Sequence, residues 1–196
     1  MLRLKCWCQV DKTLILASRS PQRLRLLQDY GFDVEVRVPQ IDETPQSGES
    51  PSALVERLAL EKLRDVIEPH ETGLAADTVA VIDDKILGKP GTQKRAVAML
   101  EYLSGQTHQI IGGIAFRHGG QDISGVISTE VTFRDLTDEE IEDYVKIGES
   151  LDKAGGYAIQ GHGADLISKV DGCQENVIGL SMNAVFELMQ FLKTQE

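Results

Sequence analysis

A few polar side chains occur where burial or a rigid turn would hold them still enough to do chemistry. Asp77 lies inside an otherwise apolar run at 73–82, and an acid there is costly to bury unless a cation, a metal or a substrate compensates it. Glu43 lies in a polar, proline-containing stretch of the kind that often carries functional groups. For Asp77 a purely structural hydrogen-bonding role, and for Glu43 a solvated loop position, are the alternative interpretations.

Hydroxyl and basic residues surround a predicted helix start that follows an apolar strand. Ser20 is a good N-cap and Pro21 a good first helical residue. The first turn of such a helix presents free backbone N–H groups and a partial positive charge. With Ser18 before it and Arg23 within it, this segment predicts a cradle for a phosphate group.

Two lysines are candidates for further contacts to an anion. Lys62 lies in a predicted helix, where a solvated lysine paired with a nearby acid is the alternative interpretation. Lys89 lies between Gly88 and Pro90, a rigid turn that would fix the direction of its side chain.

A glycine-rich segment, GGYAIQG at 155–161, offers a site of a different kind. Its glycines permit close approach of the backbone, and the Gln160 amide carries both a donor and an acceptor. That combination can read the edge of a nucleotide base, although a purely structural glycine loop remains the alternative.

Strands and helices that would position these residues alternate along the chain. Strands are predicted at 14–17, 33–38, 73–82, 85–87, 109–116, 123–133 and 165–170, and helices at 21–30, from 51 past 62, at 93–103, after 137 and at 180–193. The third strand is expected to be interrupted at 76–78 and the fifth to be broken at Gly112 and Gly113. Since some strands follow one another directly, the pattern favours an α/β fold with a mixed sheet flanked by helices.

Composition narrows the class of partner. The 196 residues suit one domain, predicted at 13–196 after an N-terminal extension at 1–12. A net charge of −11 argues against an extended surface for polymeric nucleic acid, but not against a free nucleotide in a locally basic pocket. No run is apolar enough to cross a membrane, and residues 1–12 lack the apolar core of a secretory signal. Three cysteines without framework spacing indicate a reducing compartment.

Taken in order, several short segments resemble the Maf family of nucleoside triphosphate pyrophosphatases. They are LASRSPQR at 16–23, IDET at 41–44, LALEK at 58–62, ADT at 76–78, GKP at 88–90, LSGQTH at 103–108 and DKAGGYAIQG at 152–161. The resemblance covers about 14–192. It implies an elongated, two-lobed Maf/ITPase-like fold with a deep central cleft, a cytoplasmic location and a homodimer.

The resemblance also implies an activity: hydrolysis of a nucleoside triphosphate to the monophosphate and pyrophosphate with a divalent cation, Mg²⁺ or Mn²⁺. Asp77 would be the catalytic base, and Glu43 and Asp77 would supply hard oxygen ligands for the metal. Ser18, Arg23, Lys62 and Lys89 would bind the phosphates. A nucleotide-binding regulator of septum formation with little turnover is the alternative from a different functional class.

Base choice would depend on Gln22, Thr78 and Gln160. The Asp77-Thr78 pair and the YAIQG segment are similar to members that prefer dTTP and UTP. The dTTP/UTP members usually carry arginine at the position of Gln22, and the 7-methyl-GTP members tend to carry tryptophan there, so Gln22 matches neither pattern. Hydrolysis of 7-methyl-GTP or a modified purine nucleotide is therefore kept as the alternative.

Overall fold

A computed structural model of the chain describes residues 13–194, so the predicted extension at 1–12 lies outside the described residues. The strands are β1 (Leu14–Ala17), β2 (Val34–Arg37), β3 (Gly73–Ile82), β4 (Lys85–Leu87), β5 (Thr107–His118), β6 (Gln121–Phe133) and β7 (Ile167–Asp171). The helices are α1 (Pro21–Asp29), α2 (Pro51–Val66), α3 (Gln93–Leu103), α4 (Asp138–Ile147), α5 (Gln174–Ile178) and α6 (Met182–Lys193), with short 3₁₀ turns at Ala154–Gly156 and Gly161–Leu166.

The strands form a mixed, seven-stranded sheet in the order β2-β1-β3-β5-β6-β7, with β4 paired to β3. Strand β1 runs parallel to both β2 and β3. The pairings of β3 with β4 and β5, of β5 with β6 and of β6 with β7 are antiparallel. The predicted mixed sheet flanked by helices is confirmed.

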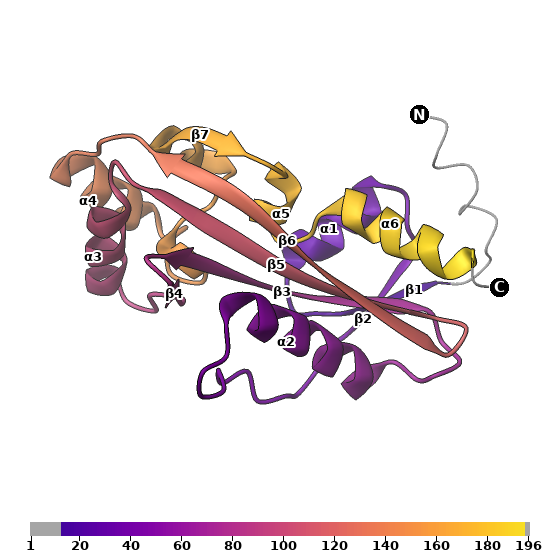
Figure 1. Cartoon of the computed structure of the whole chain (residues 1–196). Helices are drawn as coiled ribbons and strands as arrows, with labels where there is room; N and C mark the ends of the chain where they lie inside the picture. The colour runs from indigo at the N-terminus through magenta and orange to yellow at the C-terminus, as the bar shows by residue number, and fades with distance from the viewer. Residues whose placement is uncertain (1–12, 195–196) are drawn as a thin grey trace.

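Helices cover both faces of the end of the sheet that contains β1 (Figure 1). Because side chains alternate along a strand, Leu14 and Leu16 pack on the side of α1 and α6. Ile15 and Ala17 pack with α2 on the opposite side. Figure 1 shows α2 and α6 on opposite sides of the sheet.

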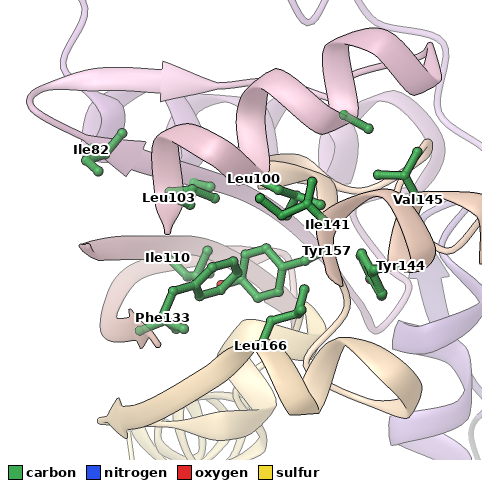
Figure 2. Packing of buried hydrophobic residues seen from close by; sticks show 13 residues of the cluster. Ile82, Leu100, Leu103, Ile110, Phe133, Ile141, Tyr144, Val145, Tyr157 and Leu166 are labelled. Atoms are coloured by element: carbon green, nitrogen blue, oxygen red, sulfur yellow. The ribbon is translucent and has the colours of Figure 1, made fainter. Parts of the chain in front are cut away.

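A separate core lies at the other end of the elongated molecule, where α3 and α4 pack beside β5 and β6 (Figure 1). Phe133, Tyr144, Tyr157 and Leu100 meet at its centre (Figure 2). The ring centroids of Phe133 and Tyr157 are 4.8 Å apart in an edge-to-face arrangement. The molecule therefore has two lobes joined by the long strands β3, β5 and β6.

The two predicted strand interruptions are wrong. Strand β3 runs without a break through 76–78, and β5 runs through Gly112 and Gly113. The glycines serve close packing instead: a Cβ atom on Gly113 would lie 2.2 Å from the backbone oxygen of Val55 in α2. Because these glycines have no side chains, α2 and the side chain of Asn176 can approach β5 closely without disturbing the hydrogen bonds of the strand.

Two further differences concern exposure and a missed helix. The alternation at 33–38 predicts a half-buried strand, but Val36 and Val38 are 41% and 44% exposed because β2 is at the edge of the sheet. Helix α5 was not predicted, and the closing helix begins at Met182 rather than Leu180. Within 13–194 no helix is both long and apolar enough to span a membrane.

Candidate functional site

A cavity of about 1010 Å³ lies between the two lobes, where α1, α2, β3, the loop at 39–45 and the segment at 149–161 converge. All nine predicted site residues line it: Ser18, Gln22, Arg23, Glu43, Lys62, Asp77, Thr78, Lys89 and Gln160. The predicted deep cleft is therefore present, and residues from six separate segments meet in it.

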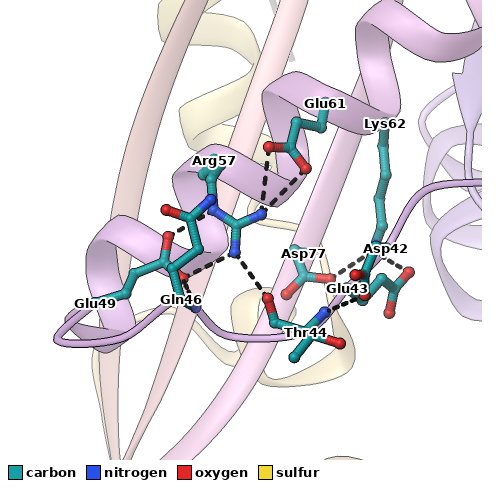
Figure 3. A network of polar contacts seen from close by, with 9 residues as sticks. All are labelled: Asp42, Glu43, Thr44, Gln46, Glu49, Arg57, Glu61, Lys62 and Asp77. Atoms are coloured by element: carbon teal, nitrogen blue, oxygen red, sulfur yellow. Dashed lines mark hydrogen bonds and ion pairs between the residues drawn. The ribbon is translucent and has the colours of Figure 1, made fainter.

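An ammonium group holds two carboxylates together at the centre of the cavity (Figure 3). Lys62 Nζ lies 2.6 Å from Asp77 Oδ1 and 2.8 Å from Glu43 Oε1. Lys62 and Asp77 are only 6% and 9% exposed, so the alternative of a solvated Lys62 is wrong. Three elements supply this group: α2, the middle of β3 and the loop after β2.

Local sequence explains how α1 contributes to the cavity. Ser20 caps the helix by accepting a hydrogen bond from Arg23 N at 3.4 Å. Ser18 Oγ accepts from Ser20 N at 3.1 Å, which ties the end of β1 to the start of α1. The side chain of Gln22 turns back and accepts from Ser20 Oγ at 3.1 Å.

The guanidinium of Arg23 is held by neutral acceptors. Nε donates to Gly179 O at 2.9 Å, Nη1 to Ser18 Oγ at 3.3 Å and Nη2 to Thr78 Oγ1 at 3.1 Å. Among residues 13–194 no carboxylate forms a hydrogen bond or ion pair with it. A cation placed in this way in a cavity is suited to bind an anion from solution.

Helix α5 holds the acceptor that directs Arg23. Asn176 is 1% exposed, and its Nδ2 donates to Ile110 O at 3.0 Å and to Thr129 Oγ1 at 3.2 Å. Its Oδ1 occupies the space beside Gly112, where a Cβ atom would lie 2.1 Å away. This network fixes α5 on β5 and β6, and hence fixes the carbonyl of Gly179 at the end of the helix.

Two tyrosines, both labelled in Figure 2, hold the segment at 151–161 in place: Tyr144 of α4 and Tyr157 of the segment itself. Tyr144 Oη accepts from Ala158 N at 3.0 Å, and Tyr157 Oη lies 2.7 Å from His108 Nε2. Burial lowers the pKa of His108 to about 4, so the imidazole is neutral at pH 7. Gln160 is exposed at the cavity wall, and Lys89 is exposed on the turn before α3.

The charged groups that line the cavity affect one another's pKa values. Burial lowers the pKa of Arg23, while the charges of Asp77 and Glu43 act to raise it. Burial also acts to raise the pKa of Glu43, but the hydrogen bond and charge of Lys62, with the charges of Lys89 and Arg23, hold it below its ordinary value. Glu43 is therefore ionised at neutral pH.

Two carboxylates here have the chemistry of metal ligands. Glu43 and Asp77 approach the same ammonium, so a divalent cation placed there could contact oxygen atoms of both. No cluster of three or more His, Cys, Asp or Glu side chains suited to a metal occurs in the described part of the chain. Such a site would need further ligands from water or from a bound phosphate.

Four of the lining residues had no role predicted from the sequence: Gly179, Glu149, Asp152 and Lys153. Asp152 and Lys153 belong to the DKAGGYAIQG motif at 152–161, but the motif alone did not assign them a function. Gly179 acts through its backbone carbonyl, which has no signature in side-chain types. Glu149 follows α4 and resembles a residue of an ordinary solvated turn.

Known proteins resemble this chain over most of its length. A family model described as Maf-like protein matches residues 13–192. The dTTP/UTP pyrophosphatase of Symbiobacterium thermophilum is 43% identical over 90% of this chain and 92% of its own length. That of Photorhabdus laumondii is 44% identical, covering 91% and 93%, and that of Halalkalibacterium halodurans is 45% identical, covering 88% and 92%.

Among solved structures, the Staphylococcus aureus Ham1 protein aligns with a TM-score of 0.49 at 17% identity, covering 94% of this chain and 100% of its own. Membership does not depend on that alignment, because the family model spans nearly all of the described residues and the relatives are identical to this chain at more than two fifths of the aligned positions. The chain belongs to the Maf family.

Proposed function

We propose that this protein hydrolyses nucleoside triphosphates between the α and β phosphates, with dTTP and UTP as substrates. The products would be the nucleoside monophosphate and pyrophosphate. The observation that carries the proposal is the pairing of buried Lys62 and Asp77 with the more exposed Glu43, in the same cavity as an Arg23 guanidinium that pairs with no carboxylate among residues 13–194. The names of the relatives, dTTP/UTP pyrophosphatase, support the same activity.

The cavity supplies the cations that a triphosphate requires. A triphosphate carries close to four negative charges, and Arg23, Lys62 and Lys89 all line the cavity. Arg23 can offer forked hydrogen bonds to phosphate oxygens, because its present acceptors are uncharged. Ser18 and the N–H groups at the start of α1 add neutral donors.

A divalent cation, Mg²⁺ or Mn²⁺, fits the donor set at Glu43 and Asp77. Mg²⁺ is commonly held by one or two carboxylates together with substrate phosphates, and these two carboxylates already converge on one cation, Lys62 Nζ. When bound, the metal would neutralise phosphate charge and lower the pKa of a water molecule. Lys62 would then keep the two carboxylates in place from the side of α2.

Asp77 would accept the proton of the attacking water. Its Oδ1 accepts a hydrogen bond from Lys62 Nζ, so Oδ2 would take the proton, at a different stage from any binding of the metal. The water oxygen would bond to the α-phosphorus as the bond from that phosphorus to the α–β bridging oxygen breaks. The electron pair of that bond would leave on pyrophosphate, whose charge the cations of the cavity stabilise.

Base selection would fall to residues at the cavity wall. Gln160 offers an amide to the edge of the base, Thr78 hydrogen-bonds with Arg23 at 3.1 Å, and Gln22 turns back to Ser20. Members that act on dTTP and UTP usually have arginine where this chain has Gln22. The assay should therefore include 7-methyl-GTP beside dTTP, UTP, CTP, GTP and ATP.

The experiment is a pyrophosphate-release assay on that panel with Mg²⁺ or Mn²⁺. The wild type is expected to release pyrophosphate, not single phosphates, from dTTP and UTP. Asp77→Asn should lower kcat by about 10²–10⁴-fold, the usual contribution of a general base, with an unchanged circular dichroism spectrum. Asp83→Asn, at the turn after the same strand, should keep wild-type activity. Full turnover by Asp77→Asn, or binding of nucleotides without pyrophosphate release by the wild type, would contradict the proposal.

A further inference from the structure

Glu149 is a carboxylate without a partner in the wall of the cavity. Its Oε2 is buried and has no hydrogen-bond partner among the described residues. The other acids that line the cavity are all paired: Glu43 and Asp77 with Lys62, and Asp152 with Lys153 at 2.8 Å. Glu149 is therefore the exception among the lining acids of residues 13–194.

The position of Glu149 is unfavourable for a negative charge. It follows directly after Gly148, the C-cap of α4, where the carbonyl ends of the helix carry partial negative charge. Its charge also contributes to the raised pKa of Tyr144, which burial chiefly lifts to about 12. A buried acceptor without a donor is destabilising, so the fold holds the Glu149 carboxylate here at a cost to its stability.

Glu149 lies beside Gly161, the residue that follows the one proposed to read the base. A Cβ atom on Gly161 would be 2.9 Å from Glu149 Oε1, and both Glu149 and Gln160 line the cavity. A side chain that can only accept and an amide that can donate are thus part of the same wall. Uracil and thymine present the matching pair along one edge, a keto oxygen next to an imino N–H.

We propose that Glu149 is a specificity-determining residue. Its carboxylate would accept a hydrogen bond from the imino N–H of the base, while the Gln160 amide would donate one to the neighbouring keto oxygen. This inference rests on the proposed function. The pair would admit keto–imino bases, and it would reject cytosine and adenine, whose ring nitrogen at that place is itself an acceptor and would face a carboxylate. Guanine shares the keto–imino edge, so the choice between pyrimidine and purine would be made elsewhere in the cavity.

The test compares UTP with CTP in wild type, Glu149→Gln and Glu149→Ala. The wild type should prefer UTP. Glu149→Gln should lower kcat/KM for UTP by about tenfold, because a neutral amide oxygen replaces a charged acceptor. The same variant should raise kcat/KM for CTP, because the new amide can donate to the cytosine ring nitrogen. Glu149→Ala should lose UTP activity without gaining CTP activity.

Thermal unfolding separates this role from a structural one. Removal of an unpaired buried charge should leave the melting temperature unchanged or higher in Glu149→Gln, and Glu142→Gln on the exposed face of α4 serves as the matched control. A lower melting temperature, or failure to fold, with equal loss for both nucleotides would overturn the inference, as would an unchanged UTP/CTP ratio. In each of these cases pyrophosphate release from UTP by the wild type would leave the proposed function standing.

Discussion

The buried ammonium group of Lys62 is the positive charge that compensates the two carboxylates at the centre of the site. It lies 2.6 Å and 2.8 Å from oxygens of Asp77 and Glu43. If one of the two acids is lost, the ammonium stays paired with the other, so no buried charge is left uncompensated. Two acids facing one lysine carry one excess negative charge, so the centre is prepared for a second cation.

Glu43 is the member of this group whose loss should be tolerated by the fold, because its side chain is 60% exposed. In Glu43→Gln the charge that would help to hold Mg²⁺ is gone while the shape remains. We expect the Mg²⁺ concentration for half-maximal activity to rise about tenfold, as loss of one charged contact implies. A metal titration of pyrophosphate release measures it.

The adjacent Asp42→Asn is the control for that titration. Asp42 Oδ1 accepts from Thr44 N at 2.9 Å, a contact that an asparagine oxygen can replace. If both variants keep the wild-type metal requirement, Glu43 is not a metal ligand.

At the scale of elements, Arg57 of α2 is one of the residues that attach the loop at 39–50 near the cavity (Figure 3), beside Lys62, which pairs with Glu43, and Asp65, which accepts from Gln40 N at 2.7 Å. Arg57 Nη2 donates to Thr44 O at 3.3 Å, next to Glu43. Nε and Nη2 also donate to Glu49 at 2.6 Å and 2.8 Å, and Nη1 donates to Glu61 at 3.1 Å. The loop has no helix or strand of its own, so this clamp fixes where Glu43 can reach.

Arg57→Gln should therefore lower activity through Glu43 although Arg57 does not line the cavity. We expect a severalfold higher Mg²⁺ requirement and faster proteolytic cleavage within 39–50, because the loop loses its charged anchor. Combined with Glu43→Gln, the effects on metal affinity should not add. Arg64→Gln, on the same helix but paired with Asp122, should change neither readout. Additive effects would contradict the coupling.

The same clamp has a defined response to pH. The hydrogen bonds from Arg57 hold the pKa of Glu49 at about 2, against an ordinary value of 4.5. A lowered carboxyl pKa contributes stability that is complete above the ordinary value and is lost as the pH falls through the folded value. The contribution of this contact to stability should thus be complete above about pH 4.5 and should decline progressively as the pH falls from there toward 2.

At the scale of the whole molecule, the cavity exists because two lobes with separate cores share the strands β3 and β5. Close contact of α2 with β5 determines how near Lys62 comes to Asp77. That contact depends on Gly113, where a Cβ atom would lie 2.2 Å from Val55 O and 2.8 Å from Glu56 N. Backbone atoms on both sides cannot yield without moving the helix.

Gly113→Ala should consequently destabilise the fold by about 1–3 kcal/mol or more, the range for overpacking. Equilibrium unfolding in denaturant measures it. Gly125→Ala on β6 is the matched control, since its nearest atom is Leu188 Cδ2 at 3.8 Å. Equal stability of the two variants would show that α2 can shift freely against β5.

Several helix starts and strands of this structure could be predicted from residues that lie close together in the sequence. Ser20-Pro21, Ser50-Pro51 and Thr137 each predicted a helix start, and each caps a helix in the structure. Apolar runs bounded by turn residues placed β1 and β3 correctly. These signals succeed because a cap or a short strand depends on residues within a few positions of one another.

Other features were decided only by tertiary structure. From the sequence alone, the glycine pair of β5 predicts a break in the strand. The groups that pack against these glycines, α2 and Asn176, are distant in the sequence, so the reason for the glycines is visible only in the fold. Helix α5 is five residues long and is held by contacts of Asn176 with β5 and β6 rather than by its own propensity. Val36 and Val38 are exposed because β2 is an edge strand, which alternation alone does not specify.

By itself the sequence determined the residue types of the site and the elements that carry them, because the order and spacing of short motifs are local properties. Only the tertiary structure decided that Lys62 is buried and pairs with two acids, that Gly179 directs Arg23 and that Glu149 Oε2 has no hydrogen-bond partner within 13–194. Burial and pairing depend on which distant segments meet, and those meetings are set by the packing of helices on a shared sheet.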